Sequence, residues 1–274
     1  MSQSIKIRLE FLLLLFLALS LQLGYWNSWK FLYGINLPFR YFGVFFHELG
    51  HALSSILTGS KAYLIKMVFF GGGITFCGED PKIIIAFAGY CSGSLVGVVL
   101  FYFISNSLES TIMCIPYILL GIFATVGLLF IRDFETLLIL ILMWGTIRAL
   151  IYMVNLKEIK LFLKFIAIYL IIDGGVSAYF TNLKTDFDSL ISFAGESAIL
   201  WDGAKISKLT GYNINFIVNA WISCSVLALS IAWLSNEKSI KVGWYNNYEE
   251  LSNAFSPTND KVKFVDNEIK KADW

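Results

Sequence analysis

Long apolar runs separated by short polar stretches make up most of this chain. A helix needs about 20 predominantly apolar residues to cross the hydrocarbon core of a bilayer, and seven runs come near that length. They cover residues 7–23, 37–57, 83–104, 112–131, 134–154, 161–180 and 214–234. The pattern predicts an all-α polytopic membrane protein with about seven transmembrane helices.

The first run resembles a secretory signal in one respect, because it follows Lys6 and Arg8 near the N-terminus. Its cleavage cue is weak and six further runs follow, so we expect a transmembrane helix. The third run contains small residues four positions apart, among them Gly89, Gly93 and Gly97. Small residues let helix backbones approach closely in lipid, so this helix should pack at the centre of the bundle.

Residues 62–78, between the second and third runs, have a different pattern. Short β-branched and aromatic stretches flank Gly71, Gly72 and Gly73. This arrangement predicts a short glycine-rich β-hairpin, with a membrane-associated loop as the alternative. Beyond residue 235 the chain is polar and mixes both charge signs. We therefore expect a transmembrane domain at residues 1–235 and a soluble, partly disordered tail at residues 236–274.

Composition agrees with the apolar pattern. Hydrophobic residues make up 57% of the 274 residues and charged residues 15%, and the mean hydropathy is +0.68. These values are typical of a protein that is surrounded by a lipid bilayer. The formal net charge is +1 and Lys and Arg form no basic patch, which argues against a nucleic-acid partner. Because Lys and Arg fall in similar numbers on both predicted sides, they set no orientation in the membrane.

The second run contains the pentapeptide His47-Glu48-Leu49-Gly50-His51, which holds the only two histidines of the chain. On a helix, residues four apart lie on one face, so both imidazoles can bind one metal while Glu48 reaches a water from the same side. Zinc acidifies water and polarises a carbonyl, and a glutamate can pass the water's proton to the leaving amine. The motif predicts a membrane-embedded peptidase with one zinc ion, the ligands His47 and His51, and Glu48 as the catalytic base.

A third protein ligand is required, because catalytic zinc usually takes three and a water. No histidine remains and no cysteine is well placed, so a carboxylate is needed. Two pairs compete, Asp202-Gly203 in a polar stretch before the last run and Asp173-Gly174 within the sixth run. Asp202 could also be an ordinary helix N-cap, and Asp173 could mark a helix break or a water-facing helix end. Sequence spacing leaves both candidates open.

Four segments carry further motifs. They are the metal motif within residues 46–53, the glycine-rich stretch at 71–75, an Ala-Gly-Tyr segment at 88–94 and the acidic segment at 202–211. Together they resemble the site-2 protease family of intramembrane zinc metallopeptidases, and within it a divergent, compact bacterial branch. The resemblance covers most of the chain between residues 46 and 233, and the metal motif is its most specific part.

The resemblance implies a choice of third ligand. In this family an Asp of an Asp-Gly pair completes the zinc site, which favours Asp202 over Asp173. The usual Asn and Pro ahead of that pair are absent at both places. Asp173 is followed by Gly174 and Gly175 and matches the Asp-Gly-Gly of the broader family better.

The resemblance also implies an intramembrane zinc metalloendopeptidase, which hydrolyses peptide bonds in or near a membrane-spanning segment of a protein substrate. A substrate helix must unwind before cleavage, and a strand edge at Gly71, Gly72 and Gly73 would hold it extended. A metal-binding or inactive membrane scaffold or chaperone, and an ion-coupled transporter, are the alternatives. We expect a multi-pass integral protein of the bacterial cytoplasmic membrane, with the lipid bilayer and a membrane protein substrate as partners. The sequence carries no signal for a particular oligomeric state.

Overall fold

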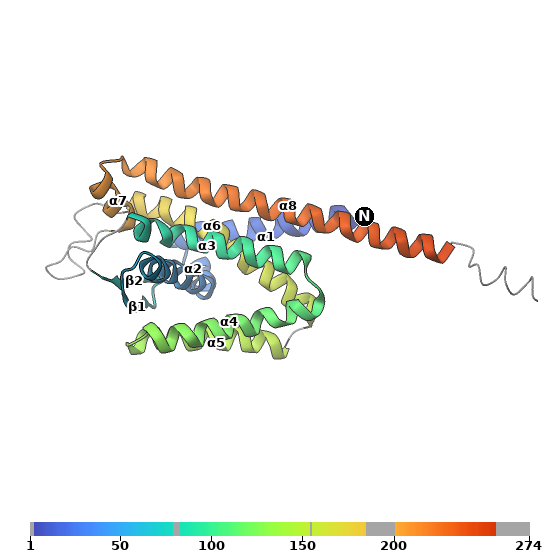
Figure 1. Cartoon of the computed structure of the whole chain (residues 1–274), viewed down its shortest axis with the longest axis horizontal. Helices are drawn as coiled ribbons and strands as arrows, with labels where there is room; N and C mark the ends of the chain where they lie inside the picture. Colours follow the sequence, from blue (N-terminus) through green and yellow to red (C-terminus); the bar gives the residue numbers. More distant parts are fainter. Residues whose placement is uncertain (1–2, 79–82, 154, 185–200, 256–274) are drawn as a thin grey trace, which may run out of the picture.

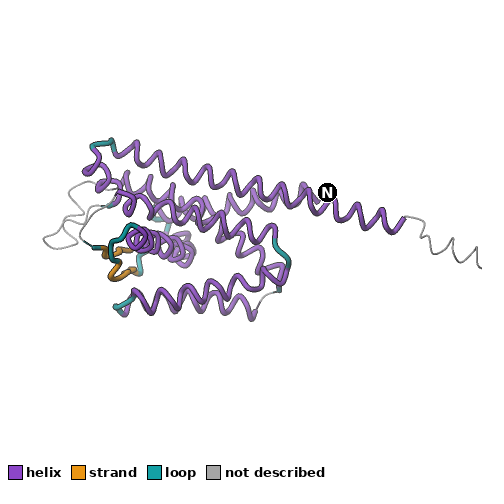
Figure 2. Tube along the Cα trace, in the orientation of Figure 1, coloured by secondary structure: helices purple, strands orange, loops and turns teal. Residues whose placement is uncertain are grey.

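A computed structural model describes residues 3–78, 83–153, 155–184 and 201–255, and within these ranges it contains eight helices and one two-stranded sheet (Figure 1). The elements in chain order are α1 (Gln3–Trp26), α2 (Lys30–Leu57), β1 (Ala62–Val68), β2 (Gly72–Cys77), α3 (Ile83–Asn106), α4 (Glu109–Phe130), α5 (Phe134–Met153), α6 (Leu156–Lys184), α7 (Asp202–Thr210) and α8 (Ile214–Phe255). The predicted all-α polytopic fold with a short glycine-rich β-hairpin is confirmed (Figure 2).

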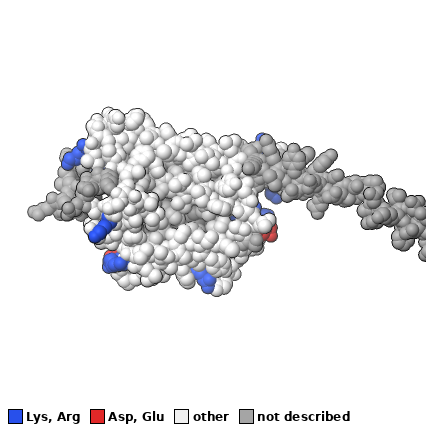
Figure 3. Space-filling model, viewed as in Figure 1, with Lys and Arg blue, Asp and Glu red and all other residues white. Residues whose placement is uncertain are grey.

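Six of the described helices, α1, α3, α4, α5, α6 and α8, are long and apolar enough to cross a membrane, so the chain is a multi-pass integral membrane protein. Figure 3 shows a face that is largely uncharged, with Lys and Arg mostly toward its two ends. The seventh predicted span, α2, is not among the six, because Arg40, Glu48 and the two histidines lower its apolar character. Figure 1 views α2 almost along its axis, while the six spans run along the length of the picture. The metal motif therefore lies on a helix that crosses the bundle steeply.

The centre of the bundle is formed by α3 and α6. Helix α3 contacts α2, α6 and α8. In the most apolar stretch of α6, 83% of the residues are buried. Glycines bring the two helices together: a Cβ at Gly97 would lie 2.5 Å from the carbonyl oxygen of Ala167, and one at Gly174 would overlap the carbonyl oxygen of Tyr90. The prediction that the third run packs centrally through small residues is confirmed.

Helices α4 and α5 lie side by side, and both contact β1 (Figure 1). Asp133 caps α5 by accepting a hydrogen bond of 2.9 Å from the amide of Thr136. The Thr136 hydroxyl accepts the amide of Met67 at 2.8 Å, and the Glu135 carboxylate accepts the amide of Phe69 at 2.8 Å. These bonds attach the outer edge of β1 to the beginning of α5.

The hairpin pairs its strands in antiparallel register, with Ile65 opposite Thr75 and Met67 opposite Gly73. Gly71 lies in the turn with φ of +83°, in the left-handed region that glycine adopts at little cost. The backbone conformation thus explains one of the three successive glycines.

Two helix boundaries differ from the predictions, and the surroundings of Asp173 differ from the alternatives considered for it. Helix α2 begins at Lys30, seven residues before the apolar run at 37–57, and it therefore contains Pro38 in its interior. Proline removes one backbone donor, and packing by neighbouring helices compensates for such a loss in a membrane bundle. Helix α6 continues through Asp173, which is therefore neither at a break nor at a helix end. Helix α8 continues to Phe255, past the expected boundary at residue 235. Residues 256–274 lie outside the described ranges, and the division into a membrane domain and a soluble tail stays a prediction.

Candidate metal centre

His47 and His51 lie one turn apart on the same face of α2, as their spacing predicts. Their Nε2 atoms are 3.0 Å apart, and the rings meet edge to face. Gly89 of α3 lies directly against both rings, since a Cβ there would be 2.5 Å from Nε2 of His51 and 2.8 Å from Cε1 of His47. A glycine at this position leaves room for the two imidazoles between α2 and α3.

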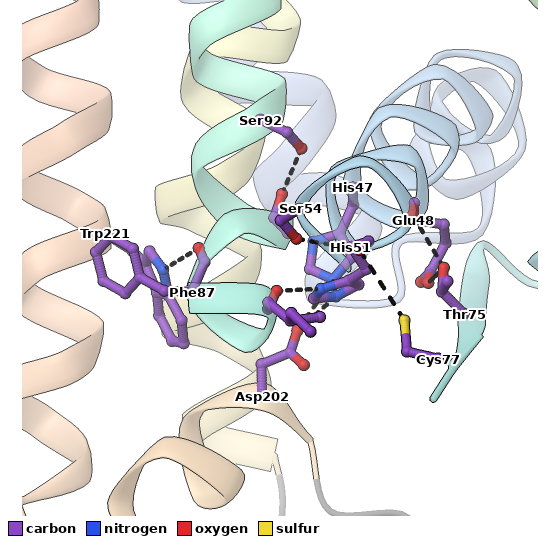
Figure 4. Close-up of polar contacts among 12 residues, drawn as sticks. His47, Glu48, His51, Ser54, Thr75, Cys77, Phe87, Ser92, Asp202 and Trp221 are labelled. Atoms are coloured by element: carbon purple, nitrogen blue, oxygen red, sulfur yellow. Dashed lines mark hydrogen bonds and ion pairs between the residues drawn. The ribbon is translucent and has the colours of Figure 1, made fainter. Parts of the chain in front are cut away.

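Asp202 joins the two histidines, although it lies 155 residues beyond His47 in the sequence. It is the first residue of α7, a short helix that packs against α3 and α8. Its Oδ2 atom is 3.1 Å from Nε2 of each histidine (Figure 4). Across the described ranges, His47, His51 and Asp202 form a group whose ligand atoms all lie within 4.8 Å of one another. The fold therefore brings one of the two candidate aspartates to the metal motif.

The residues around Asp202 explain how α7 is held in place. Trp201 occupies the N-cap position, so Asp202 itself lies in the first turn and is not the N-cap. The Trp201 ring lies 6.4 Å from the ring of Trp221, whose Nε1 donates a hydrogen bond of 3.1 Å to the carbonyl oxygen of Phe87. A Cβ at Gly203 would overlap the Trp201 ring. The glycine of the Asp-Gly pair therefore makes room for the tryptophan that precedes it.

A backbone hydrogen bond fixes the tautomer of His51. Its Nδ1 lies 2.6 Å from the carbonyl oxygen of Ile85, and a carbonyl can only accept, so Nδ1 carries the proton. In the neutral ring, Nε2 then presents its lone pair toward His47 and Asp202. Outer hydrogen bonds of this kind orient the histidines of metal sites.

The electrostatics of the cluster favour a charged carboxylate. Burial on its own raises the pKa of Asp202, but the positive charge of His51 when that ring is protonated, together with hydrogen bonds from both histidines, outweighs burial and holds that pKa below its usual range. Two imidazole nitrogens and a carboxylate oxygen directed at one point are a typical donor set for a divalent metal such as zinc. Tetrahedral zinc with bonds of about 2.1 Å would separate its ligand atoms by about 3.4 Å. The separations of 3.0 and 3.1 Å seen here differ from that value by only a few tenths of an ångström.

Glu48 lies beside this group and faces the hairpin. Only 4% of Glu48 is exposed, and its Oε2 accepts a hydrogen bond of 2.7 Å from the hydroxyl of Thr75 in β2. Gly73 lies against the same side chain, because a Cβ there would be 2.8 Å from Cγ and Oε1 of Glu48. Figure 4 shows Glu48 directed toward Thr75. Of the hairpin glycines, Gly73 thus contacts Glu48, whereas Gly71 lies in the turn and Gly72 pairs with Val68.

Asp173 belongs to a different cluster. Its Oδ1 accepts hydrogen bonds from Gln22 at 2.5 Å, from Arg40 at 2.7 Å and from Ser177 at 3.0 Å. It is not part of the group of ligand atoms formed by the histidines and Asp202. The structure therefore brings Asp202, and not Asp173, to the two histidines.

The sequence patterns do not single out two residues of these clusters, Arg40 and Thr75. The sequence could have indicated Arg40, because a charged residue inside an apolar run needs a partner of opposite charge, and Asp173 is a charged residue in another apolar run. Thr75 had none, since its contact with Glu48 depends on how the hairpin folds back onto α2.

Comparison with known proteins places the chain in a family. A family model described as Peptidase M50B-like matches residues 11–232, a range that includes the metal motif and Asp202. No curated protein and no solved structure matches the chain. The family match covers more than half of the 274 residues, and it confirms the resemblance to the site-2 proteases. The chain belongs to the Peptidase M50B-like family, and so to the site-2 protease family.

Proposed function

We propose that this protein is an intramembrane zinc metalloendopeptidase, which hydrolyses peptide bonds in or near a membrane-spanning segment of a protein substrate. The observation that carries the proposal is the convergence of His47, His51 and Asp202 next to the buried carboxylate of Glu48. Membership of a family of membrane metallopeptidases supports it.

In this proposal His47, His51 and Asp202 hold one zinc ion through the three atoms that lie 3.0 to 3.1 Å apart. Three protein ligands are the usual number for a catalytic zinc site. When bound, zinc supplies a Lewis acid that polarises the scissile carbonyl and acidifies water.

Glu48 is the proposed catalytic base. Its carboxylate takes a proton from the attacking water and delivers it to the nitrogen of the leaving amine. The Thr75 hydroxyl holds one carboxylate oxygen at 2.7 Å and so restricts the orientation of the base. Burial of Glu48 keeps bulk water away from this proton transfer.

The hairpin offers a binding edge for an extended substrate. The amide of Met67 points away from β2, toward Thr136, so by strand alternation the backbone groups of Gly73 and Thr75 in β2 point to its free edge. A substrate segment that unwinds could pair with this edge beside Glu48, since a new strand satisfies backbone groups that lipid cannot. Gly71, Gly72 and Gly73 would shape the approach, and the substrate would be a membrane protein.

The test uses the full chain, purified in detergent and reconstituted in lipid vesicles with a panel of transmembrane peptides. Cleavage should depend on zinc, stop on chelation and return when zinc is added back. A protein that binds zinc and cleaves no peptide of the panel would point to a metal-binding scaffold. Ion flux across the vesicle membrane without cleavage would point to a transporter.

A further inference from the structure

A largely buried ion pair between Asp173 of α6 and Arg40 of α2 lies outside the metal centre and yet reaches the hairpin. We propose that this pair is a positioning unit: Arg40, fixed by Asp173, holds the turn of the hairpin and thereby places β2 against Glu48. Its kinetic consequence rests on the proposed peptidase function, whereas its structural consequence does not.

The carboxylate of Asp173 accepts hydrogen bonds from side chains of three helices. A charge inside an apolar bundle is costly unless it is paired and hydrogen-bonded. Oδ1 of Asp173 accepts hydrogen bonds from Gln22 of α1, Arg40 of α2 and Ser177 of its own helix, at 2.5, 2.7 and 3.0 Å. Gly43 of α2 makes room for the group, because a Cβ there would overlap the carboxylate. The pair thus fixes α1, α2 and α6 relative to one another.

Arg40 transmits this constraint to the hairpin. While Nη1 bonds Asp173, Nε donates a hydrogen bond of 3.1 Å to the carbonyl oxygen of Gly71 in the turn. The guanidinium carbon also lies 5.6 Å from the ring centre of Tyr25 and 5.5 Å from that of Trp26, which are cation–π distances. The guanidinium group of Arg40 therefore binds Asp173 and the turn of the hairpin at the same time.

The two preceding carbonyl groups of the turn are held in the same way. Tyr25 donates a hydrogen bond of 2.7 Å to the carbonyl of Phe70, and Tyr41 donates one of 2.9 Å to the carbonyl of Phe69. With Arg40 on the next carbonyl, three successive backbone acceptors are bound by side chains of α1 and α2. Each bond restricts the turn relative to α1 or α2, so the three bonds together specify where the turn lies.

The position of the turn sets the surroundings of Glu48. Gly73, two residues beyond Gly71, lies against the Glu48 side chain, and Thr75 donates to its carboxylate. Because β2 is one continuous strand, a displaced turn would shift both contacts. Arg40 and Asp173 would thus orient the base without touching the reacting atoms.

The experiment replaces Asp173 by Asn in the full chain loaded with zinc. It measures zinc content, hydrogen–deuterium exchange of peptides covering residues 62–78, and kcat and KM on a cleavable transmembrane peptide. Asp173→Asn should keep its zinc and exchange the turn amides about tenfold faster. Its kcat should fall by about 10- to 100-fold, with a smaller change in KM, because the misplaced group is the base.

A second ion pair on α6 supplies the matched control. Lys164 lies 2.7 Å from Glu10 of α1, and its side chain is 9% exposed against 11% for Arg40. It lies nine residues before Asp173, roughly 13 Å further along the helix. Lys164→Met should match the wild type in zinc content, hairpin exchange and kcat.

Arg40→Lys keeps the positive charge and is a second test of the positioning role. It can be measured even if Asp173→Asn does not fold. One ammonium group cannot reproduce the fork that binds Asp173 and Gly71 together, so turn exchange should again rise while zinc is retained. Zinc loss in Asp173→Asn, or unchanged hairpin exchange in the variant that folds, would overturn the inference. If the wild type cleaves no peptide, only the proposed peptidase function is contradicted. Hydrogen–deuterium exchange of the hairpin still tests the positioning role.

Discussion

Three carboxylates of this bundle have the same chemistry and different neighbours. Asp173 meets the guanidinium of Arg40, Asp202 meets the two imidazoles, and Glu48 meets the hydroxyl of Thr75. A guanidinium neutralises a carboxylate and satisfies its lone pairs. Imidazole nitrogens that present lone pairs do neither, so their shared site favours a cation. At the scale of single residues, these neighbours separate the roles that we propose for a structural ion, a ligand and a base.

Glu48→Gln tests the role of the base. The amide keeps the size of the side chain and cannot take a proton from water. Zinc content should stay at the wild-type level while turnover falls by a factor on the order of 10² to 10⁴. Metal analysis alongside a cleavage assay would separate the two effects. Loss of zinc in this variant would assign Glu48 to the metal instead.

Asp202→Asn tests the third ligand. The uncharged amide oxygen binds zinc poorly, so affinity should fall by at least about tenfold, while Asp173→Asn should have the smaller effect. Titration against a chelator of known zinc affinity measures both. The assignment would be wrong if Asp173→Asn lost more zinc than Asp202→Asn.

At the scale of elements, local sequence was informative wherever an element depends on its own residues. Apolar length predicted the six spans, and the run from Gly71 to Gly73 predicted the hairpin. The steep crossing of α2 depends on its neighbours, and so does its passage through Pro38. The approach of Asp202 to the histidines depends on how α7 packs against α3 and α8. No spacing rule encodes a contact across 155 residues, which is why Asp173 and Asp202 both stayed open.

Gly203→Ala tests how α7 presents Asp202. The added methyl group would overlap the Trp201 ring, so the start of α7 should shift and zinc affinity should fall several-fold. Gly145→Ala in α5 is the control, because nothing lies within 4 Å of a Cβ there. The same chelator titration compares the two. Equal affinities in both variants would show that Trp201 does not hold Asp202 in place.

At the scale of the whole molecule, helix packing and not metal should hold the bundle together. The core of α3 and α6 buries apolar and small residues along the spans. His47→Ala and His51→Ala should each lose zinc, because one imidazole and one carboxylate bind it weakly. Their helical circular dichroism and gel-filtration profile should remain those of the wild type. Full zinc occupancy in either variant would place the metal elsewhere, and loss of helicity would contradict the packing argument.

The position of the histidines along the length of α3 has a consequence for the two fragments of a cleaved substrate. His51 contacts Ile85 and Gly89, which lie about 3 to 9 Å from the first residue of that span. The hydrocarbon core is about 30 Å thick, so the proposed cut falls within one leaflet rather than at the midplane. One fragment should then keep most of its hydrophobic length and stay anchored, while the other retains too few apolar residues to remain in the bilayer. Mass spectrometry of both fragments would show this asymmetry, and cuts at the centre of the substrate helix would contradict it.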